Sequence, residues 1–364
     1  MTREIYVGLM SGTSLDGVDA VLVDFAGGRP RLVARASHAF DAALRRELLA
    51  LNFPGTNEIE RAALAGNELA KKYAAAVTEV LAKSKTPATE VRAIGCHGQT
   101  VRHRPERGYT TQIGNAALLA ELTGIRVVAD FRSRDVAAGG QGAPLAPAFH
   151  AAMFADAAED RVVLNLGGIA NLTFLPCHGD VIGFDSGPGN CLLDLWASRH
   201  LGTPHDAHGN WAAAGVAIAP SLDRMLRDPY FAAAPPKSTG RDVFNERWLQ
   251  KKLKADEDPQ AVQATLLELT ARSLADAVAR HCAAARRLIV CGGGTKNDAL
   301  MRRLAELAAP AALETSDRYG IDPQLVEATA FAWLAKQTLD GVAGNLPSVT
   351  GARTARVLGA IYPG

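Results

Sequence analysis

The feature that most constrains this 364-residue chain is that many of its 34 glycines are bunched, and four of these clusters each adjoin a short apolar run. The clusters read GLMSGTSLDGVD from Gly8, NLGGIAN from Asn165, GFDSGPGN from Gly183 and CGGGTKN from Cys291. Glycine permits positive φ angles and close backbone approach, so these clusters predict tight turns or ligand-binding loops at strand ends. We therefore expect an α/β protein whose function depends on these loops.

The apolar periodicity predicts two α/β halves in succession. In the first half we expect strands at 4–10, 18–25 and 31–40, helices at 41–51 and 58–83, a strand ending at Cys96, a helix at 116–122 and a strand at 126–131. In the second half we expect a helix through 154, strands at 161–166, 171–175, 181–184 and 287–290, helices at 191–200, 245–254 and 259–282 and from 297 and 323, and a terminal strand or strand-helix end at 354–361.

Each half opens with antiparallel strands joined by a glycine turn, which predicts a duplicated fold. We expect domain one to span residues 1–140 and domain two residues 141–364, facing one another across a cleft where ligands bind. The segment 228–241 contains three prolines and is predicted to be a loop or a lid.

Composition excludes several classes of protein. Hydrophobic residues make up 48% of the chain and charged residues 21%, which excludes general disorder. A net charge of +1 argues against nucleic-acid binding through many phosphate contacts. The five cysteines are far apart and odd in number, so neither a zinc ribbon nor a disulfide framework is indicated. The N-terminal residues do not resemble a signal peptide, and the longest apolar run is too short to span a bilayer, so we expect a cytoplasmic protein without a membrane partner.

The first two glycine clusters are typical of phosphate-binding turns. Backbone N–H groups and the hydroxyls of Ser11, Thr13 and Ser14 can donate to an anion, while Asp16 and Asp19 can hold Mg²⁺ directly or through water. Gly167 and Gly168 occupy the matching place in the second half, so the two turns together could hold a polyphosphate. The alternative is that both are ordinary hairpins in which the polar side chains only satisfy the turn backbone.

The other two clusters suggest a base and a nucleoside site. Asp185 ends a predicted strand just before a helix N-terminus, which suits a general base, while the helix end would favour an incoming phosphate. Asp185 could instead serve as a cap and turn residue. The flat backbone of residues 292–294 could admit a nucleobase or ribose, and Lys296 and Asn297 either assist there or only begin the next helix.

Two charged residues outside the clusters are further candidates. Arg132 lies just past a strand and could grip a carboxylate, or it could pair with Asp135 at the surface. Glu327 lies in an otherwise apolar helix and either faces solvent or faces a ligand. The P-loop, the Rossmann GxGxxG and the common serine-nucleophile motifs are absent from the sequence. His97 and His103 have a poor metal-ligand spacing, so a structural or substrate-binding role is favoured.

In this order, the pieces resemble the actin, Hsp70 and sugar kinase superfamily, in which two ribonuclease-H-like domains enclose a nucleotide. More specifically, the chain resembles the anhydro-N-acetylmuramic acid kinase family from Gly8 to Trp333. The motifs that carry this resemblance are GLMSGTSLDGVD, GCHGQT, QIGN, ADFRSRDVAAGGQGAPL, NLGGIANLT, GFDSGPGN and EATAFAWLA.

The resemblance implies an ATP- and Mg²⁺-dependent enzyme of peptidoglycan recycling. It would open the 1,6-anhydro ring of anhydro-N-acetylmuramic acid with water and phosphorylate O6. By the same resemblance, Asp185 is the catalytic base. Its neighbour Ser186 stands where many relatives have Thr, and the hydroxyl is kept.

The remaining roles come from the matching motif blocks. The segment that binds the ATP phosphates corresponds to Gly12, Thr13, Ser14, Leu15, Asp16, Gly17, Val18 and Asp19. The second phosphate loop and the adenosine side correspond to Gly167, Gly168, Gly292, Gly293, Gly294 and Asn297. Sugar binding is assigned to Gln99, Arg132, Gly187, Asn190 and Glu327.

Two alternatives stay open from the sequence. One is a kinase for another amino or anhydro sugar, and the other is a non-enzymatic ATP-binding module of the same fold that senses nucleotide or forms filaments. The expected partner is a small-molecule sugar, and whether the chain is a monomer or a homodimer stays open.

Overall fold

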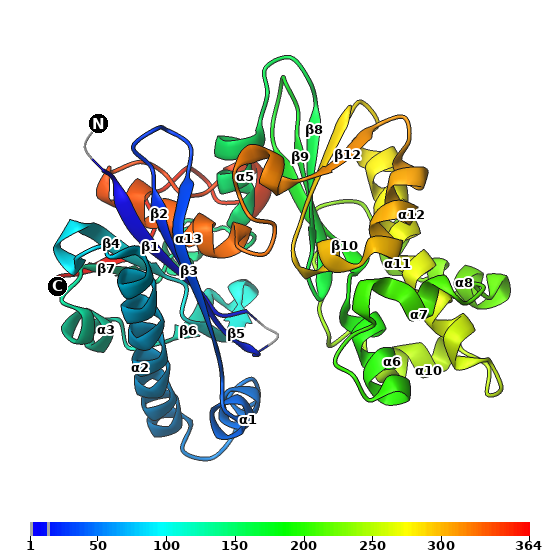
Figure 1. The fold of residues 1–364 in the computed structure, drawn as a ribbon, viewed down its shortest axis with the longest axis horizontal. Coiled ribbons are helices and arrows are strands. Elements are labelled where there is room, and N and C mark those ends of the chain that lie inside the picture. The colour runs from blue at the N-terminus through cyan, green and yellow to red at the C-terminus, as the bar shows by residue number, and fades with distance from the viewer. Residues whose placement is uncertain (1–2, 13–14) are drawn as a thin grey trace. The chain divides into compact units, whose positions relative to one another are not determined.

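The computed structural model describes residues 3–12 and 15–364 (Figure 1). It divides into two compact units, one that runs up to Phe149 and also includes Leu325–Gly364, and one formed by His150–Gln324. The sequence-based boundary at residue 140 is therefore close to the first crossing point. The assignment of everything beyond it to the second domain is wrong, because the C-terminal segment returns to the first unit, as the orange and red ribbon beside the blue strands shows (Figure 1).

The first unit is built on a mixed sheet with the strand order β13-β7-β4-β1-β2-β3. Its strands are β1 Ile5–Met10, β2 Gly17–Asp24, β3 Arg31–Ala39, β4 Val91–Cys96, β7 Val127–Ala129 and β13 Ala360–Tyr362, with a separate hairpin of β5 Gln99–Arg104 and β6 Tyr109–Ile113. Its helices are α1 Ala42–Ala50, α2 Glu58–Ser84, α3 Ala116–Thr123, α4 Ser133–Ala137, α13 Val326–Leu339 and α14 Pro347–Thr350, and α5 Ala146–Phe154 spans the boundary between the units.

Successive side chains of β1 lie on opposite faces of the sheet, and α13 packs on the face where Gly8 lies. Val7 and Leu9 pack into the core that α2 covers, with Leu69 and Val77 on that helix. Gly8 points to the opposite face, where a Cβ atom would lie 1.9 Å from the carbonyl oxygen of Ala328 on α13. Since successive residues of a strand face opposite sides, the sheet is covered on both faces, and only glycine lets α13 approach so closely.

The second unit repeats this plan with the strand order β10-β9-β8-β11-β12. Its strands are β8 Arg161–Leu166, β9 Ile169–Leu175, β10 Ile182–Pro188, β11 Arg287–Cys291 and β12 Ala312–Thr315. Its helices are α6 Cys191–Leu201, α7 Asn210–Ala213, α8 Ala219–Leu226, α9 Pro229–Ala232, α10 Glu246–Lys252, α11 Pro259–His281 and α12 Asp298–Ala308. Leucines and valines of β8, α11 and α12 form its core.

The duplication predicted from element order is confirmed in the topology. In each unit the first strand pairs antiparallel with the second, the second pairs antiparallel with the third, and the first pairs in parallel with the fourth. This is the ribonuclease-H-like arrangement, and it confirms the predicted α/β fold class.

Several elements of the fold were not predicted, among them the short helices α4, α7 and α8. The β5–β6 hairpin was missed because Val101 is the single apolar residue of β5, and β12 was missed because it is a four-residue edge strand. The predicted loop or lid at 228–241 holds the short helix α9. Among the described residues, the structure contains no helix with the length and apolar character to cross a membrane.

Candidate active site

The first glycine hairpin connects β1 to β2. Of the predicted phosphate-binding residues, Thr13 and Ser14 lie outside the described residues. Leu15 adopts a left-handed conformation with φ of 56°, and its N–H donates to the Gly12 carbonyl over 3.2 Å. Leu15 is thus bonded back to Gly12 just before β2 begins.

Side chains from outside the hairpin hold its carbonyl oxygens. The imidazole of His97 contacts the Ser11 carbonyl oxygen through Nδ1 at 3.2 Å, and Gln99 donates from Nε2 to the Gly12 carbonyl at 3.2 Å. The Ser11 hydroxyl lies 2.8 Å from the Tyr73 hydroxyl and donates to the Gly98 carbonyl at 3.0 Å. The carbonyl groups that would repel a phosphate are thus bound within the protein, which suits a turn that offers its N–H groups to an anion.

Some glycines of this cluster serve packing. Gly8 accommodates α13, as described above, and a Cβ atom on Gly17 would lie 2.2 Å from the carbonyl oxygen of His38 on β3. The glycine-rich sequence around the hairpin therefore has two causes, close packing of its strands and freedom of its turn.

Arg132 is linked to the hairpin through His97. Its Nη2 lies 2.9 Å from Nε2 of His97, and its Nη1 donates to the Gly142 carbonyl over 2.8 Å. Burial and the charge of Arg132 lower the pKa of His97 to about 3, so the imidazole is neutral, with Nε2 as the acceptor and Nδ1–H as the donor to Ser11. Burial lowers the pKa of Arg132 to about 10, so it keeps its charge at neutral pH.

Glu327 lies in the first turn of α13, in the same unit. Solvent reaches its side chain, yet desolvation by the surrounding protein raises its pKa, while the positive charge of Arg132 lowers it and the negative charge of Asp19 raises it. The structure therefore brings together Arg132 and Glu327, the two charged residues predicted to bind sugar, and adds Asp19 to them. A cation beside a carboxylate that solvent reaches is well suited to a polar ligand.

The structure buries both Gln99, which was predicted to bind sugar, and Asp135, for which a surface pair with Arg132 was one alternative. Gln99 is only 1% exposed, and its side chain contacts the hairpin at the Gly12 carbonyl. Its Oε1 atom is buried and has no hydrogen-bond partner in the described part of the chain. Asp135 is fully buried, so its pairing with Arg132 at the surface is excluded. Its carboxylate accepts from the N–H of Gly142 at 2.7 Å, from Asn345 at 2.6 Å and from Thr350 at 2.7 Å, which ties the loop after α4 to the C-terminal segment.

The hairpin offers two carboxylates, Asp16 and Asp19, as candidate ligands for Mg²⁺. Asp19 is half-buried, accepts from the Ser37 hydroxyl at 2.6 Å and lies close enough to Glu327 to raise its pKa, so a cation beside it would relieve repulsion between the two acids. Asp16 is exposed. No group of three or more metal-ligating side chains occurs among residues 3–12 and 15–364, but Mg²⁺ commonly binds through one or two carboxylates, phosphates and water.

In the second unit, Asp185 lies on β10 next to a β-bulge. Pairing with β9 shifts register between Asp185 and Gly187, so Ser186 is the extra residue, and its hydroxyl donates to the Ala170 carbonyl at 3.1 Å. Bulges re-aim neighbouring side chains and are common beside active sites. Burial raises the pKa of Asp185, although hydrogen bonds from Thr239 and Ser238 lower it, so the carboxylate is a stronger base than an exposed aspartate.

The Gly167–Gly168 turn is held by backbone groups. The N–H groups of Gly189 and Cys191 donate to the Gly168 carbonyl, and that of Asn190 donates to the Gly167 carbonyl, at 2.9 to 3.0 Å. The N–H of Cys191, the first residue of α6, is therefore used by this turn, and binding of a phosphate at this helix end stays a prediction. Gly187, predicted to bind substrate, is buried with φ of 150° against the ring of Phe231.

A cavity of about 400 Å³ adjoins the fourth glycine cluster, and its volume is in the range of small-molecule sites. Gly293 is open, because a Cβ atom added to it would have no neighbouring atom closer than 3.9 Å, whereas Gly292 has a left-handed backbone and Gly294 packs on Leu166. Asn297 accepts from the N–H of Leu300 and so begins α12. The cavity is lined by Asn190, Leu193, Asp194, His205, Asp206, Ala207, His208, Gly293, Gly294, Lys296, Asn297, Asp298 and Gln324.

This cavity adjoins the predicted nucleoside site. Asn190, which was predicted to bind sugar, lies beside Gly293 and Gly294 and lines the same cavity. Gln324 was missed by sequence reasoning, and it donates to the Gly292 carbonyl at 2.8 Å and to Thr295 at 3.0 Å. Nothing local in the sequence marks it, because it lies far along the chain from the glycines it contacts.

Sequence reasoning also missed two features near the turn and the base. Arg241 lies over Gly168, with Nη2 3.2 Å from the position of a Cβ atom there, and it brings a positive charge to this turn. Residues 237–239 contact Asp185 directly. The run KSTGR at 237–241 could have drawn attention as hydroxyl and basic residues within a predicted loop.

The comparisons with known proteins match the same family over nearly the whole chain. The family model for anhydro-N-acetylmuramic acid kinase matches residues 4–364. A protein from Variovorax paradoxus with that name is 57% identical over 374 residues, and one from Nitrosospira multiformis is 52% identical over 365 residues, each match covering 100% of both chains. A third relative of the same name, from Bordetella pertussis, is 56% identical and covers 99% of this chain and 96% of its own. With a family match over nearly every residue, the chain belongs to the anhydro-N-acetylmuramic acid kinase family.

Proposed function

We propose that this protein is an ATP-dependent kinase that opens 1,6-anhydro-N-acetylmuramic acid with water and phosphorylates its O6, giving N-acetylmuramic acid 6-phosphate for cell-wall recycling. The observation that carries the proposal is the full-length family match, together with a desolvated aspartate on β10 at the position that the family resemblance assigns to the base.

Asp185 takes a proton from water as that water attacks C1 of the sugar. The C1–O6 bond breaks, O6 takes the γ-phosphoryl group of ATP, and ADP leaves. Burial supports this role, because a base with a raised pKa accepts a proton more readily than an exposed aspartate does. The hydrogen bonds from Ser238 and Thr239 lower the pKa of Asp185 and so favour the ionised carboxylate, which is the form that accepts a proton.

Arg132 and Glu327 are proposed to bind the sugar. Arg132 carries its charge on a guanidinium whose position is set by His97 and Gly142, and a fixed guanidinium suits a carboxylate such as that of the lactyl group. Glu327 accepts hydrogen bonds from sugar hydroxyl or amide groups.

The glycine loops are proposed to bind the nucleotide. Gly12 to Asp19 and Gly167–Gly168 contact phosphates, and the cavity beside Gly293 takes the adenosine. Mg²⁺, when bound, neutralises phosphate charge, and Asp19 with Asp16 would hold it together with water and phosphate oxygens.

The substrate can be tested by incubating the protein with ATP, Mg²⁺ and anhydro-N-acetylmuramic acid in ¹⁸O-water. The expected product is a 6-phosphorylated sugar with the label at C1. Turnover with a different sugar only would replace the proposed substrate. Nucleotide-dependent assembly without any sugar product would favour a non-enzymatic module.

Asp185→Asn tests the base. We expect sugar phosphorylation to fall by at least about 10³-fold, since the amide cannot accept the proton, while ATP binding measured by calorimetry stays unchanged. Asp180→Asn is a matched control, because Asp180 is exposed between β9 and β10. Turnover near the wild-type level in Asp185→Asn would remove Asp185 from the role of base.

A further inference from the structure

The two carboxylate oxygens of Asp185 have different surroundings. Oδ2 accepts from the Ser238 hydroxyl at 3.0 Å and from the Thr239 N–H at 3.0 Å. The main-chain N–H of Asp185 donates to the Lys237 carbonyl at 3.1 Å, so residues 237–239 lie along β10 like a short additional strand. No hydrogen bond to Oδ1 is found within the described part of the chain, so this oxygen remains available to a ligand.

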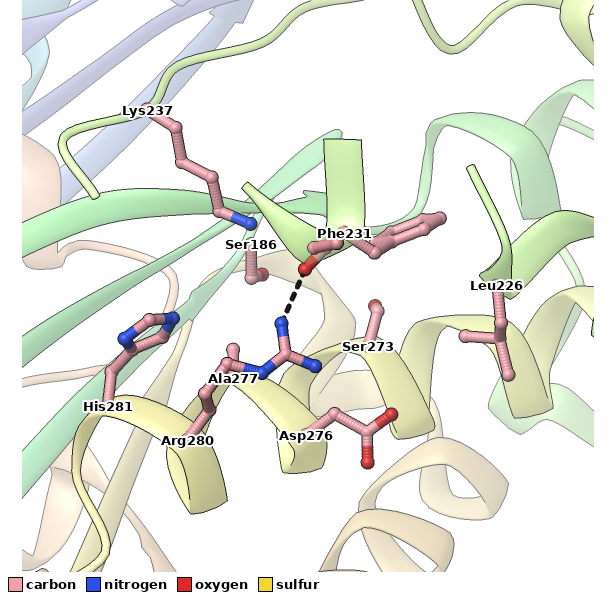
Figure 2. Close-up of a pocket in the computed structure, with 10 residues that line it drawn as sticks. Ser186, Leu226, Phe231, Lys237, Ser273, Asp276, Ala277, Arg280 and His281 are labelled. Carbon is pink, nitrogen blue, oxygen red and sulfur yellow. Dashed lines mark hydrogen bonds between the residues drawn. The ribbon is translucent and has the colours of Figure 1, made fainter. Parts of the chain in front are cut away.

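A second set of contacts fixes the position of this segment. The Tyr230 hydroxyl on α9 donates to the main-chain carbonyl of Asp185 at 2.7 Å. Lys237 donates to the Tyr230 carbonyl at 3.0 Å and lies 4.7 Å from the centre of the Tyr230 ring. Figure 2 shows Arg280 of α11 bonded to the Phe231 carbonyl, at 2.7 Å, so α9 is also anchored to the core helix of the unit. Asp185 is therefore contacted at its N–H, its carbonyl and its carboxylate by one stretch of chain.

The cations near this segment already have partners. A pocket of about 90 Å³ behind Ser186 is lined in part by Lys237, Asp276, Arg280 and His281 (Figure 2). Lys237 and Arg280 donate to carbonyl groups of α9, as described above, which accounts for their presence without a bound anion. Their function in this structure is to hold α9 against β10.

We propose that Ser238 and Thr239 are positioning residues for Asp185, which fix Oδ2 and leave Oδ1 as the atom that accepts the proton from water. This inference rests on the proposed function, in which Asp185 is the base. One proton passes from water to Oδ1 as the oxygen of water bonds to C1, and the electron pair of the C1–O6 bond stays on O6. The segment 237–239 takes no proton, since Ser238 and Thr239 only donate hydrogen bonds to the ionised carboxylate.

Hydrogen bonds to an ionised carboxylate favour that form, so their loss raises the pKa of the base further. Ser238→Ala is a suitable variant because Ser238 is exposed, so we expect the fold to tolerate the loss of its hydroxyl. We expect the acid limb of the profile of kcat/KM against pH to move upward by about one pH unit, so that kcat/KM on that limb is about tenfold lower while ATP affinity is unchanged.

Three further variants separate this role from a general structural one. Ser238→Thr keeps the hydroxyl and should restore the wild-type profile. Asp180→Asn, at an exposed residue just before β10, should leave the profile unchanged. His281→Gln should also leave the acid limb in place, which excludes titration of the neighbouring imidazole, whose pKa is lowered by burial, Arg280 and Lys237.

The outcomes distinguish this inference from the proposed function. If Asp185→Asn abolishes turnover and Ser238→Ala keeps both the acid limb and kcat, the positioning role is wrong and the base assignment stands. If Asp185→Asn retains turnover, the proposed base is wrong, and the positioning role is wrong with it. A lower kcat in Ser238→Ala without any shift of the acid limb would also overturn the inference, because the hydroxyl would then not act on the carboxylate.

Discussion

The two glycine hairpins occupy the same place in the same topology but are held by different chemistry. In the first unit, the carbonyls of Ser11 and Gly12 are bound by the side chains of His97 and Gln99, which follow β4. In the second unit, the carbonyls of Gly167 and Gly168 are bound by backbone N–H groups at the start of α6. A duplicated fold has therefore kept the turn while replacing the groups that support it.

This difference has consequences for what each hairpin can tolerate. A turn supported by side chains can be altered by an ordinary substitution at the supporting residue, and its support can also connect to other groups, as His97 connects to Arg132. A turn supported by backbone is insensitive to most side-chain changes, but it fails when a new side chain separates the two backbone segments. The two hairpins should therefore respond differently to substitutions at the groups that support them.

The largest effect is expected from Gly189→Ala in the backbone-supported turn. A Cβ atom there would lie 2.3 Å from the Gly167 carbonyl oxygen, so the turn and the start of α6 must separate. We expect a loss of about 3 kcal/mol in the free energy of unfolding by urea and much weaker ATP binding.

Gly27→Ala is the control for this variant. A Cβ atom added to Gly27 would have no neighbouring atom within 4 Å, so the free energy of unfolding should stay within about 0.5 kcal/mol of wild type. If Gly189→Ala were as stable as this control, the contact between Gly167 and Gly189 would not support the turn.

An intermediate effect is expected from His97→Ala in the side-chain-supported turn. Removing the imidazole leaves the Ser11 carbonyl and the Arg132 guanidinium without this partner, which should cost about 2 kcal/mol in unfolding free energy. Because Arg132 also loses its position, kcat/KM for the sugar should fall by at least about tenfold. The exposed His178 provides the control, His178→Ala. Normal sugar kinetics in His97→Ala would show that Arg132 is positioned by other contacts.

The smallest effect is a loss of stability at low pH, and it tests a property that both units share, a buried neutral histidine. Each unit buries a neutral histidine, His97 in the first and His150 in the second, and burial lowers the pKa of each to about 3. The unfolded chain binds protons at these residues near pH 6.5 while the folded chain does not, so stability is full above pH 6.5 and is lost as the pH falls towards 3.

For one such histidine, the loss between pH 7.5 and 5.5 is about 1.4 kcal/mol. His150→Gln should therefore reduce the difference in urea unfolding free energy between these two pH values by that amount, whatever its effect at pH 7.5. His178→Gln should leave the difference unchanged, since this side chain is exposed. An unchanged difference in His150→Gln would mean that His150 is protonated in the folded state.

Much of the fold and part of the site could be predicted from sequence. The apolar alternation and the glycine turns marked most strands of both sheets, although not β12, and Asp185 could be identified because it lies between two glycines at the end of an apolar run. These features are local, and a strand followed by a tight turn can be recognised within about ten residues because side-chain alternation and turn conformation are properties of neighbouring residues. The polar hairpin of β5 and β6 lacked that signal and was missed.

The sequence by itself determined the α/β class, the duplicated order of elements and the family motifs. Only the tertiary structure decided that α13 belongs to the first unit, that Gly8 serves packing, that Asp135 joins the loop after α4 to the C-terminal segment, and that residues 237–239 hold Asp185. The physical reason is distance along the chain. Asp135 and Asn345 are 210 positions apart, and their hydrogen bond depends on how the intervening elements pack. No local pattern specifies such a contact, because it exists only when both segments have folded against the same core.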